Sequence, residues 1–163
     1  MLLDNRKNGK VGDILRDHLR NGTKLSVISG LFSIYGYETL KKKLQSVDSI
    51  RLLLAKEPFS NCADSQAAAL AGGGFELRLK NRLDQSSVAK DCAQWLRDKA
   101  EIRVAKNPKA FGQNLLLVHG TDRNMIGIQG SSDFTSTGFG YSECDRFQMN
   151  MCAQDAPSTT AML

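Results

Sequence analysis

The sequence has few of the side chains that carry most chemistry at protein sites. It holds two histidines, His18 and His119, and four cysteines, none of which forms a C-x-x-C pair with another. A zinc site with recognisable ligand spacing is therefore not expected, and the thiols are expected to be reduced. No apolar run approaches the roughly 20 residues of a membrane-spanning helix, and no apolar leader segment follows Met1. These absences predict a cytoplasmic protein with no membrane association and no metal.

The composition is that of an ordinary globular domain with an uneven charge. The chain has 163 residues, of which 41% are hydrophobic and 24% charged, and its net charge is +5. This length fits one domain with a proper core. Residues 1–56 carry 11 Lys and Arg against 5 Asp and Glu, whereas residues 111–163 carry 2 against 5. Charge alone indicates only non-specific attraction, so a solvated basic surface is the default interpretation of the basic first third. The alternative is a surface for a polyanionic partner such as DNA or another nucleic acid.

Apolar spacing predicts alternating helices and strands along the chain. Helices are expected over about 11–19 and 35–44, with a helical hairpin or long broken helix over 75–99. Strands are expected over 24–33, 50–55, 101–105, 115–118, 125–128 and 147–151. This order indicates an α/β domain that is parallel in its first part and contains hairpins later.

Small polar residues cluster directly after the predicted strand 125–129. The segment 130–138 reads G-S-S-D-F-T-S-T-G. Glycine allows a sharp backbone turn, and hydroxyl and backbone N–H groups can hold phosphate oxygens. Taken alone, such a cluster is more often a plain surface loop. If it binds phosphate, the predicted phosphate-binding residues are Gly130, Ser131, Ser132, Asp133 and Thr135.

This cluster and three other segments resemble phospholipase D-like domains. Residues 130–140 resemble the family's G-S-S-N-F-T-x-x-G-L-G segment. Residues 3–13 and 29–37 are similar to the start of the subfamily that precedes Swi/Snf-type and DEAD-type helicases, and 95–103 resembles its W-x-R-x-K-x-E-x-R stretch. Related domains occur in restriction-type endonucleases. The resemblance implies one phospholipase D-like domain over 3–155, with a mixed, mostly parallel sheet flanked by helices on both faces. Residues 156–163 are expected to form a frayed tail.

The resemblance implies metal-independent phosphodiester hydrolysis without a cofactor. The family attacks phosphorus with the histidine of an H-x-K motif, and a G-S-x-N segment helps to hold the phosphoryl oxygens. Here Gly112 and Asn114 occupy the histidine and lysine positions, and Asp133 occupies the asparagine position. Loss of a covalent nucleophile typically costs on the order of a millionfold in rate. A chain with one copy of the motif is expected to act as a homodimer, which would bring two sites together.

Three hypotheses follow for the function. The first is a degenerate endonuclease-like domain that binds nucleic acid or serves as an assembly module beside a helicase or restriction-system protein. The second is an active metal-independent endonuclease that uses His119 as its nucleophile. The third is a non-functional, truncated remnant of a longer protein.

Overall fold

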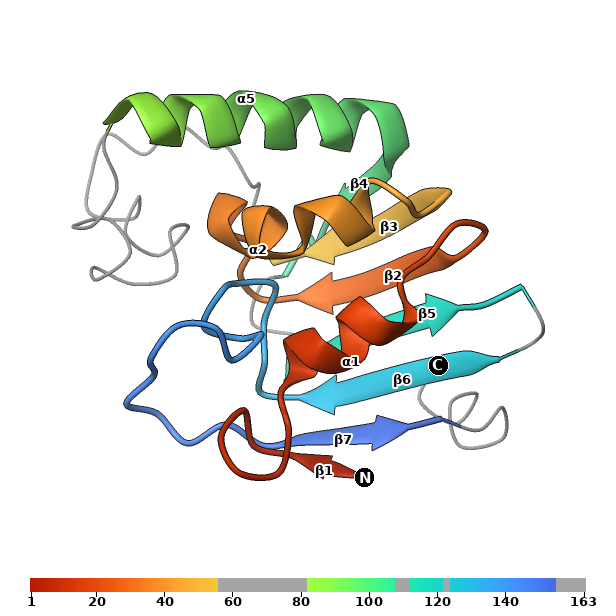
Figure 1. The fold of residues 1–163 in the computed structure, drawn as a ribbon, viewed down its shortest axis with the longest axis vertical. Coiled ribbons are helices and arrows are strands. Elements are labelled where there is room, and N and C mark those ends of the chain that lie inside the picture. Colours follow the sequence, from red (N-terminus) through yellow and green to blue (C-terminus); the bar gives the residue numbers. More distant parts are fainter. Residues whose placement is uncertain (56–81, 108–111, 122–123, 155–163) are drawn as a thin grey trace.

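The computed structural model describes residues 1–55, 82–107, 112–121 and 124–154, which form one mixed sheet with helices packed on it (Figure 1). The sheet has seven strands in the order β1-β7-β6-β5-β2-β3-β4. In chain order the elements are β1 (Leu2–Leu3), α1 (Val11–His18), β2 (Lys24–Ser29), α2 (Ile34–Leu44), β3 (Ser49–Leu54), α5 (Arg82–Lys99), β4 (Ala100–Val104), β5 (Asn114–His119), β6 (Met125–Gly130) and β7 (Asn150–Ala153).

The sheet is parallel at one end and antiparallel at the other. Strands β2, β3 and β4 run parallel, whereas β5, β6, β7 and β1 each pair antiparallel with their neighbours, as does β2 with β5. The prediction of a mostly parallel sheet was therefore wrong. The connection from β5 to β6 is short, and two strands joined by a short connection form a hairpin, in which they run antiparallel.

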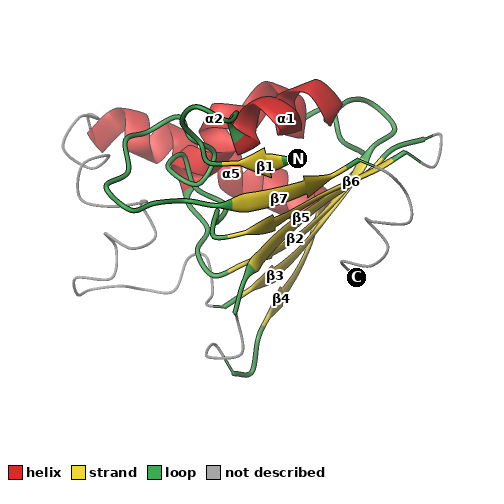
Figure 2. Cartoon of the chain, turned by 90° about the horizontal axis from the view of Figure 1, so that it is seen from below, coloured by secondary structure: helices red, strands yellow, loops and turns green. Residues whose placement is uncertain are grey.

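The helices form a single layer. Figure 2 shows α1, α2 and α5 on the same face of the sheet. The expected layer of helices on the second face is not seen in the described part of the chain. The residues that point toward the helices form the core: Leu25, Val27, Leu52, Leu116, Val118 and Ile128 from the strands, with Leu15, Leu40 and Trp95 from the helices.

The helix positions follow from the sequence pattern. Val11 and Leu15 are fully buried on one side of α1, as their spacing predicts. Helix α2 begins where Ser33 accepts a hydrogen bond from the Tyr35 amide at 3.1 Å, which is an N-terminal cap. Trp95 on α5 donates its indole N–H to the Leu44 carbonyl at 3.1 Å and fixes α5 on α2.

Several predicted elements differ from the structure at their ends. The strand expected over 24–33 ends at Ser29, and the strand expected over 147–151 is β7, at Asn150–Ala153. Strand β1 was not predicted. Residues 75–81 of the expected helical hairpin and the tail 156–163 lie outside the described residues. Within the described ranges, no helix combines the length and apolar character that crossing a bilayer requires.

Candidate functional site

Three strand ends meet at one end of the sheet, where the resemblance places the site. Asn114 at the start of β5 pairs with Gly130 at the end of β6. The Asn114 side chain accepts a hydrogen bond from the Gly30 amide at 2.8 Å, just beyond β2, and donates one to the Ser131 carbonyl at 3.2 Å. Asn114, which stands at the position of the family's lysine, therefore lies beside the glycine-serine segment. Its side chain ties the start of β5 to the backbone after β2 and to the backbone after β6.

Two of the predicted phosphate-binding hydroxyls lie inside the protein. Ser132 is 3% exposed and accepts hydrogen bonds from the amides of Asn5 and Asn150, at 3.0 and 2.9 Å. Thr135 is 2% exposed, donates to the Asp133 carboxylate at 2.6 Å and accepts from the Gly138 amide at 2.9 Å. These hydroxyls hold the loop together and do not face solvent.

The exposed member of the cluster is Ser131. Its hydroxyl oxygen accepts the Met149 amide at 2.9 Å, and its own amide donates to the Met149 carbonyl at 3.1 Å. Asp133 is half-buried, and burial raises the pKa of its carboxyl group, against the hydrogen bond from Thr135 and the charge of Arg146. The backbone around these residues is tightly packed. A Cβ on Gly130, whose φ is +157°, would lie 2.3 Å from the Met149 carbonyl oxygen.

Three of the four segments that carry the resemblance meet at this loop. Asn5 donates to the Gly138 carbonyl at 2.8 Å, contacts the Gln148 amide oxygen, and accepts the Val11 amide at 2.8 Å where α1 begins. Phe134 donates its amide to the Leu31 carbonyl at 3.2 Å and accepts the Ser33 amide at 3.0 Å. The Phe134 ring also stacks on Phe32 with centroids 5.1 Å apart. Residues 3–13, 29–37 and 130–140 are thus direct structural partners.

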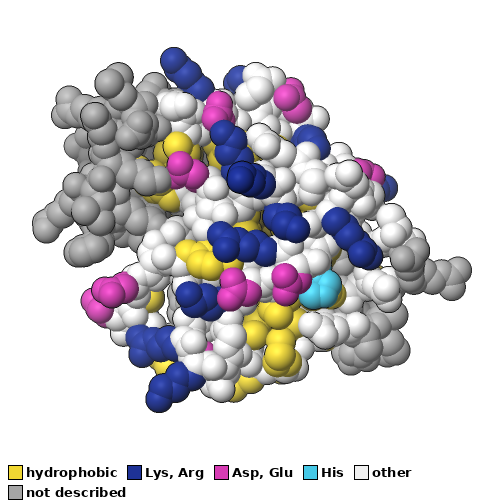
Figure 3. Space-filling view, viewed as in Figure 1, with side chains coloured by type: hydrophobic (Ala, Val, Ile, Leu, Met, Phe, Trp, Pro, Cys, Tyr) yellow, Lys and Arg dark blue, Asp and Glu magenta, His cyan; other side chains and the backbone are white. Residues whose placement is uncertain are grey.

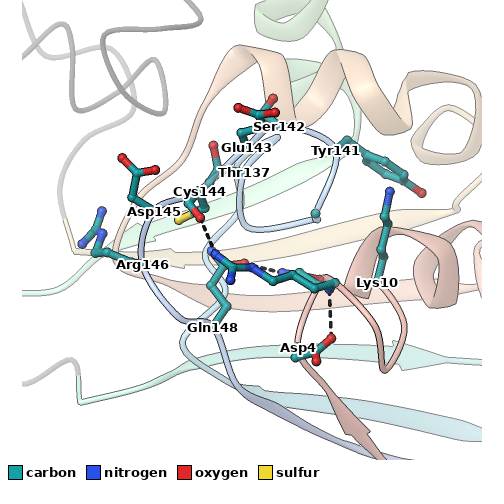
Figure 4. Close-up of a pocket in the computed structure, with 13 residues that line it drawn as sticks. Asp4, Lys10, Thr137, Tyr141, Ser142, Glu143, Cys144, Asp145, Arg146 and Gln148 are labelled. Carbon is teal, nitrogen blue, oxygen red and sulfur yellow. Dashed lines mark hydrogen bonds between the residues drawn. The ribbon is translucent and has the colours of Figure 1, made fainter.

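A cavity of about 500 Å³ opens between the first ten residues and the loop 137–148 (Figure 4). Its lining carries both charges, with Arg6, Lys10 and Arg146 against Asp4, Glu143 and Asp145. The Arg6 guanidinium donates to the Cys144 carbonyl at 2.8 Å, and Lys10 lies over the Tyr141 ring. Asp4 accepts the Arg6 and Asn8 amides, and these hydrogen bonds lower the pKa of its carboxyl group. The balanced lining gives no net attraction for an anion.

The position that the resemblance gives to the nucleophile is open. A Cβ on Gly112 would meet nothing within 4 Å. Gly112 and Asn114 stand where the family has its histidine and lysine, so these two positions carry neither an imidazole nor an ammonium group. No group of three or more His, Cys, Asp or Glu in the described ranges could hold a metal ion.

His119 lies at the far end of β5 from this site. It pairs with Met125, whereas Asn114 pairs with Gly130. His119 is five residue steps along β5 from Asn114, which is roughly 17 Å. Its Nε2 lies 3.3 Å from the hydroxyl of Ser26, which also accepts from Arg51 at 3.1 Å. Burial, followed by the charges of Arg51 and Lys24, lowers the pKa of the His119 imidazole. Within one chain, His119 and Ser131 are not brought together.

Sequence reasoning missed the side chains that organise the loop. Asn5 and Asn150 each make two side-chain hydrogen bonds to the loop, and Ser26 is the hydroxyl beside His119. The Asn150 side chain bonds both the amide and the hydroxyl of Ser132. No local pattern identifies such long-range partners, although Asn5 does lie in a segment that resembles the family.

Comparison of the sequence with models of protein families gives no match, and comparison with curated proteins gives none either. The likeness to phospholipase D-like domains therefore rests on the four segments and on residue positions alone.

Proposed function

We propose that this chain is a phospholipase D-like domain that binds nucleic acid and does not cleave it. The observation that carries the proposal is that Asn114, at the position of the family's lysine, lies beside Gly130 and Ser131. Gly112, two residues earlier in the chain, stands at the position of the family's histidine. In the family, this juxtaposition is the hydrolytic centre. Here the two positions hold a hydrogen atom and a neutral amide, and both ends of that amide are bonded to backbone.

Hydrolysis by the family route needs a nucleophile and a positive group where charge gathers on phosphorus. Neither is present at these positions. Asp133 adds a carboxylate at the family's asparagine position, although its raised pKa moderates the charge. His119 does not replace the nucleophile within one chain because β5 separates it from Ser131.

The surface that fits a polyanion is the face covered by the helices. Figure 3 shows Lys and Arg side chains spread across this face, with fewer acidic side chains between them. Lys42 and Lys43 are exposed and lie in the last turn of α2. Arg16 of α1 lies close to α2, because its guanidinium donates to the Thr39 carbonyl at 3.2 Å. The positive charges of lysines in the last turn of a helix also interact favourably with the helix dipole. Phosphate contacts by these side chains need no precise geometry, which suits binding without base readout. A homodimer and a helicase or restriction-system partner belong to this proposal as expectations from the resemblance.

The decisive experiment measures binding and cleavage together. A labelled DNA duplex and its RNA counterpart are titrated with the protein in EDTA at several salt concentrations, and the products are run on a denaturing gel. We expect binding that weakens steeply with salt, with intact nucleic acid. Lys42→Gln/Lys43→Gln should reduce the slope of log K against log salt by about 2.

The matched control removes the same charge from the other face. Lys24→Gln/Arg51→Gln changes residues of β2 and β3 that face away from the helices, and it should leave the slope nearly unchanged. Equal slopes for both double variants would overturn the assigned surface. No binding at low salt would favour the non-functional remnant. Cleavage that disappears in His119→Ala would favour the endonuclease.

A further inference from the structure

We infer that the edge strand β4 is a self-recognition surface, through which two copies of this chain join their sheets about a two-fold axis. Strand β4 ends the sheet on the side away from β1 (Figure 2). Among the described strands, it pairs with β3 only. An edge strand with apolar side chains exposes a template for another strand. On β4, Ile102 is 37% exposed and Val104 is 41% exposed.

The backbone of β4 fixes which registers are possible. The Ala105 amide donates to the Leu54 carbonyl of β3 at 2.9 Å. The backbone N–H and C=O groups of successive residues point to opposite sides of a strand. Residues 101 and 103 therefore also direct these groups toward β3, whereas Ala100, Ile102 and Val104 direct theirs outward. An antiparallel pair centred on Ile102 makes Ile102 face Ile102 of the second copy and Ala100 face its Val104. Each outward N–H then meets an outward C=O.

The charges on β4 select the same register. Glu101 and Arg103 lie two residues apart on one face of the sheet, and within one chain they form an ion pair at 2.8 Å. When Ile102 lies on the two-fold axis, Glu101 faces Arg103 of the second copy, and Arg103 faces its Glu101. Centring on residue 101 or 103 would place like charges directly opposite, which is destabilising. The sequence Ala-Glu-Ile-Arg-Val is thus complementary to its own reverse in size, polarity and charge.

This pairing differs from the dimer that the resemblance implies. Strand β4 runs parallel to β2 and β3, so its end lies on the same side of the sheet as Gly30 and Asn114. Antiparallel pairing reverses the second copy. The two Asn114–Gly130 regions then lie at opposite ends of one continuous sheet and share no centre. The self-association therefore does not depend on the proposed nucleic-acid binding.

Charge reversal tests the pairing, with sedimentation equilibrium as the readout. The unmodified chain should form a dimer in a concentration-dependent manner. Glu101→Arg alone and Arg103→Glu alone place like charges opposite each other at two equivalent positions, and each should weaken the dimer at least about tenfold. An equimolar mixture of these two variants should form a heterodimer because every facing pair is then of opposite charge. The double variant Glu101→Arg/Arg103→Glu should form a homodimer again.

The mixture separates this proposal from a purely internal role of the ion pair. An internal ion pair is restored in the double variant, but not in a mixture of two single variants. Glu143→Arg, which makes the same change at another exposed position, should leave the dimer unchanged. A monomer at every concentration of the unmodified chain would overturn the proposal. So would single variants that dimerise normally, or a mixture that does not associate.

Discussion

Replacement of Asn5 should strongly destabilise the fold, although Asn5 is only half-buried. Its side chain holds the Ser132 hydroxyl at 3.0 Å, the Gly138 carbonyl at 2.8 Å and the Val11 amide at 2.8 Å. Each such hydrogen bond contributes about 1 kcal/mol net, so Asn5→Ala should lower the free energy of unfolding by about 3 kcal/mol. With a urea dependence of about 2 kcal/mol per M, the unfolding midpoint falls by about 1.5 M.

The backbone at Asn5 adds a second, separable effect. Its φ is +59°, a conformation that asparagine tolerates better than alanine and glycine adopts freely. Asn5→Gly loses the same hydrogen bonds but avoids the backbone strain. Its free energy of unfolding should therefore exceed that of Asn5→Ala by about 1 kcal/mol, and its urea midpoint should be higher. Asn5→Asp keeps the oxygen that accepts the Val11 amide and loses the N–H donors. Its urea midpoint should therefore also lie below that of the unmodified chain.

Urea titration followed by tryptophan fluorescence measures these changes. Trp95 is the single tryptophan and is 5% exposed, so its emission reports on the packing of α5 against α2. Asn8→Ala is the control, because the Asn8 side chain bonds Asp4 in an exposed turn at 2.7 Å. The reasoning is refuted if Asn5→Ala and Asn8→Ala shift the midpoint equally.

Three further predictions concern backbone packing at two glycines, the protonation of His119 and the burial of Cys92. Gly138→Ala should destabilise by several kcal/mol, because its Cβ would lie 2.2 Å from a backbone carbonyl oxygen, whereas Gly112→Ala should be nearly neutral in the same titration. Because the pKa of His119 is below 6.5 in the folded chain, the unfolded chain binds more protons and stability should fall as the pH drops below 6.5. His119→Gln should flatten this part of a plot of urea midpoint against pH, and an unchanged slope would contradict the assignment. Burial raises the pKa of the Cys92 thiol to about 12, so mass spectrometry after brief alkylation of the native protein should find Cys144 modified and Cys92 unmodified. Equal modification of the two would show that the α5 packing is looser than described.

Local patterns predicted most elements but not their arrangement. The spacing of Val11 and Leu15, and the apolar run of β3, identified a helix and a strand that the structure contains. The pairing directions depend on how the strands are connected and ordered, and the mostly parallel expectation failed for that reason. The residues proposed for the site stay a prediction, and the structure shows only where they lie. The sequence identified the loop and its neighbour Asn114, but it also predicted phosphate contacts for Ser132 and Thr135, whose hydroxyls are buried and bonded within the protein.

The sequence by itself determined the helix and strand periods, the turn at 130–138 and the absence of histidine and lysine at positions 112 and 114. These features depend on residues close together in the chain or on residue identity. Only the tertiary structure decided that Asn5 and Asn150 bind the loop, and that His119 lies at the opposite end of β5. It also decided that β4 lies at an edge of the sheet. Such relations depend on strand order and register, which are set by burying apolar surface across the whole sheet, and no local run of residues encodes them.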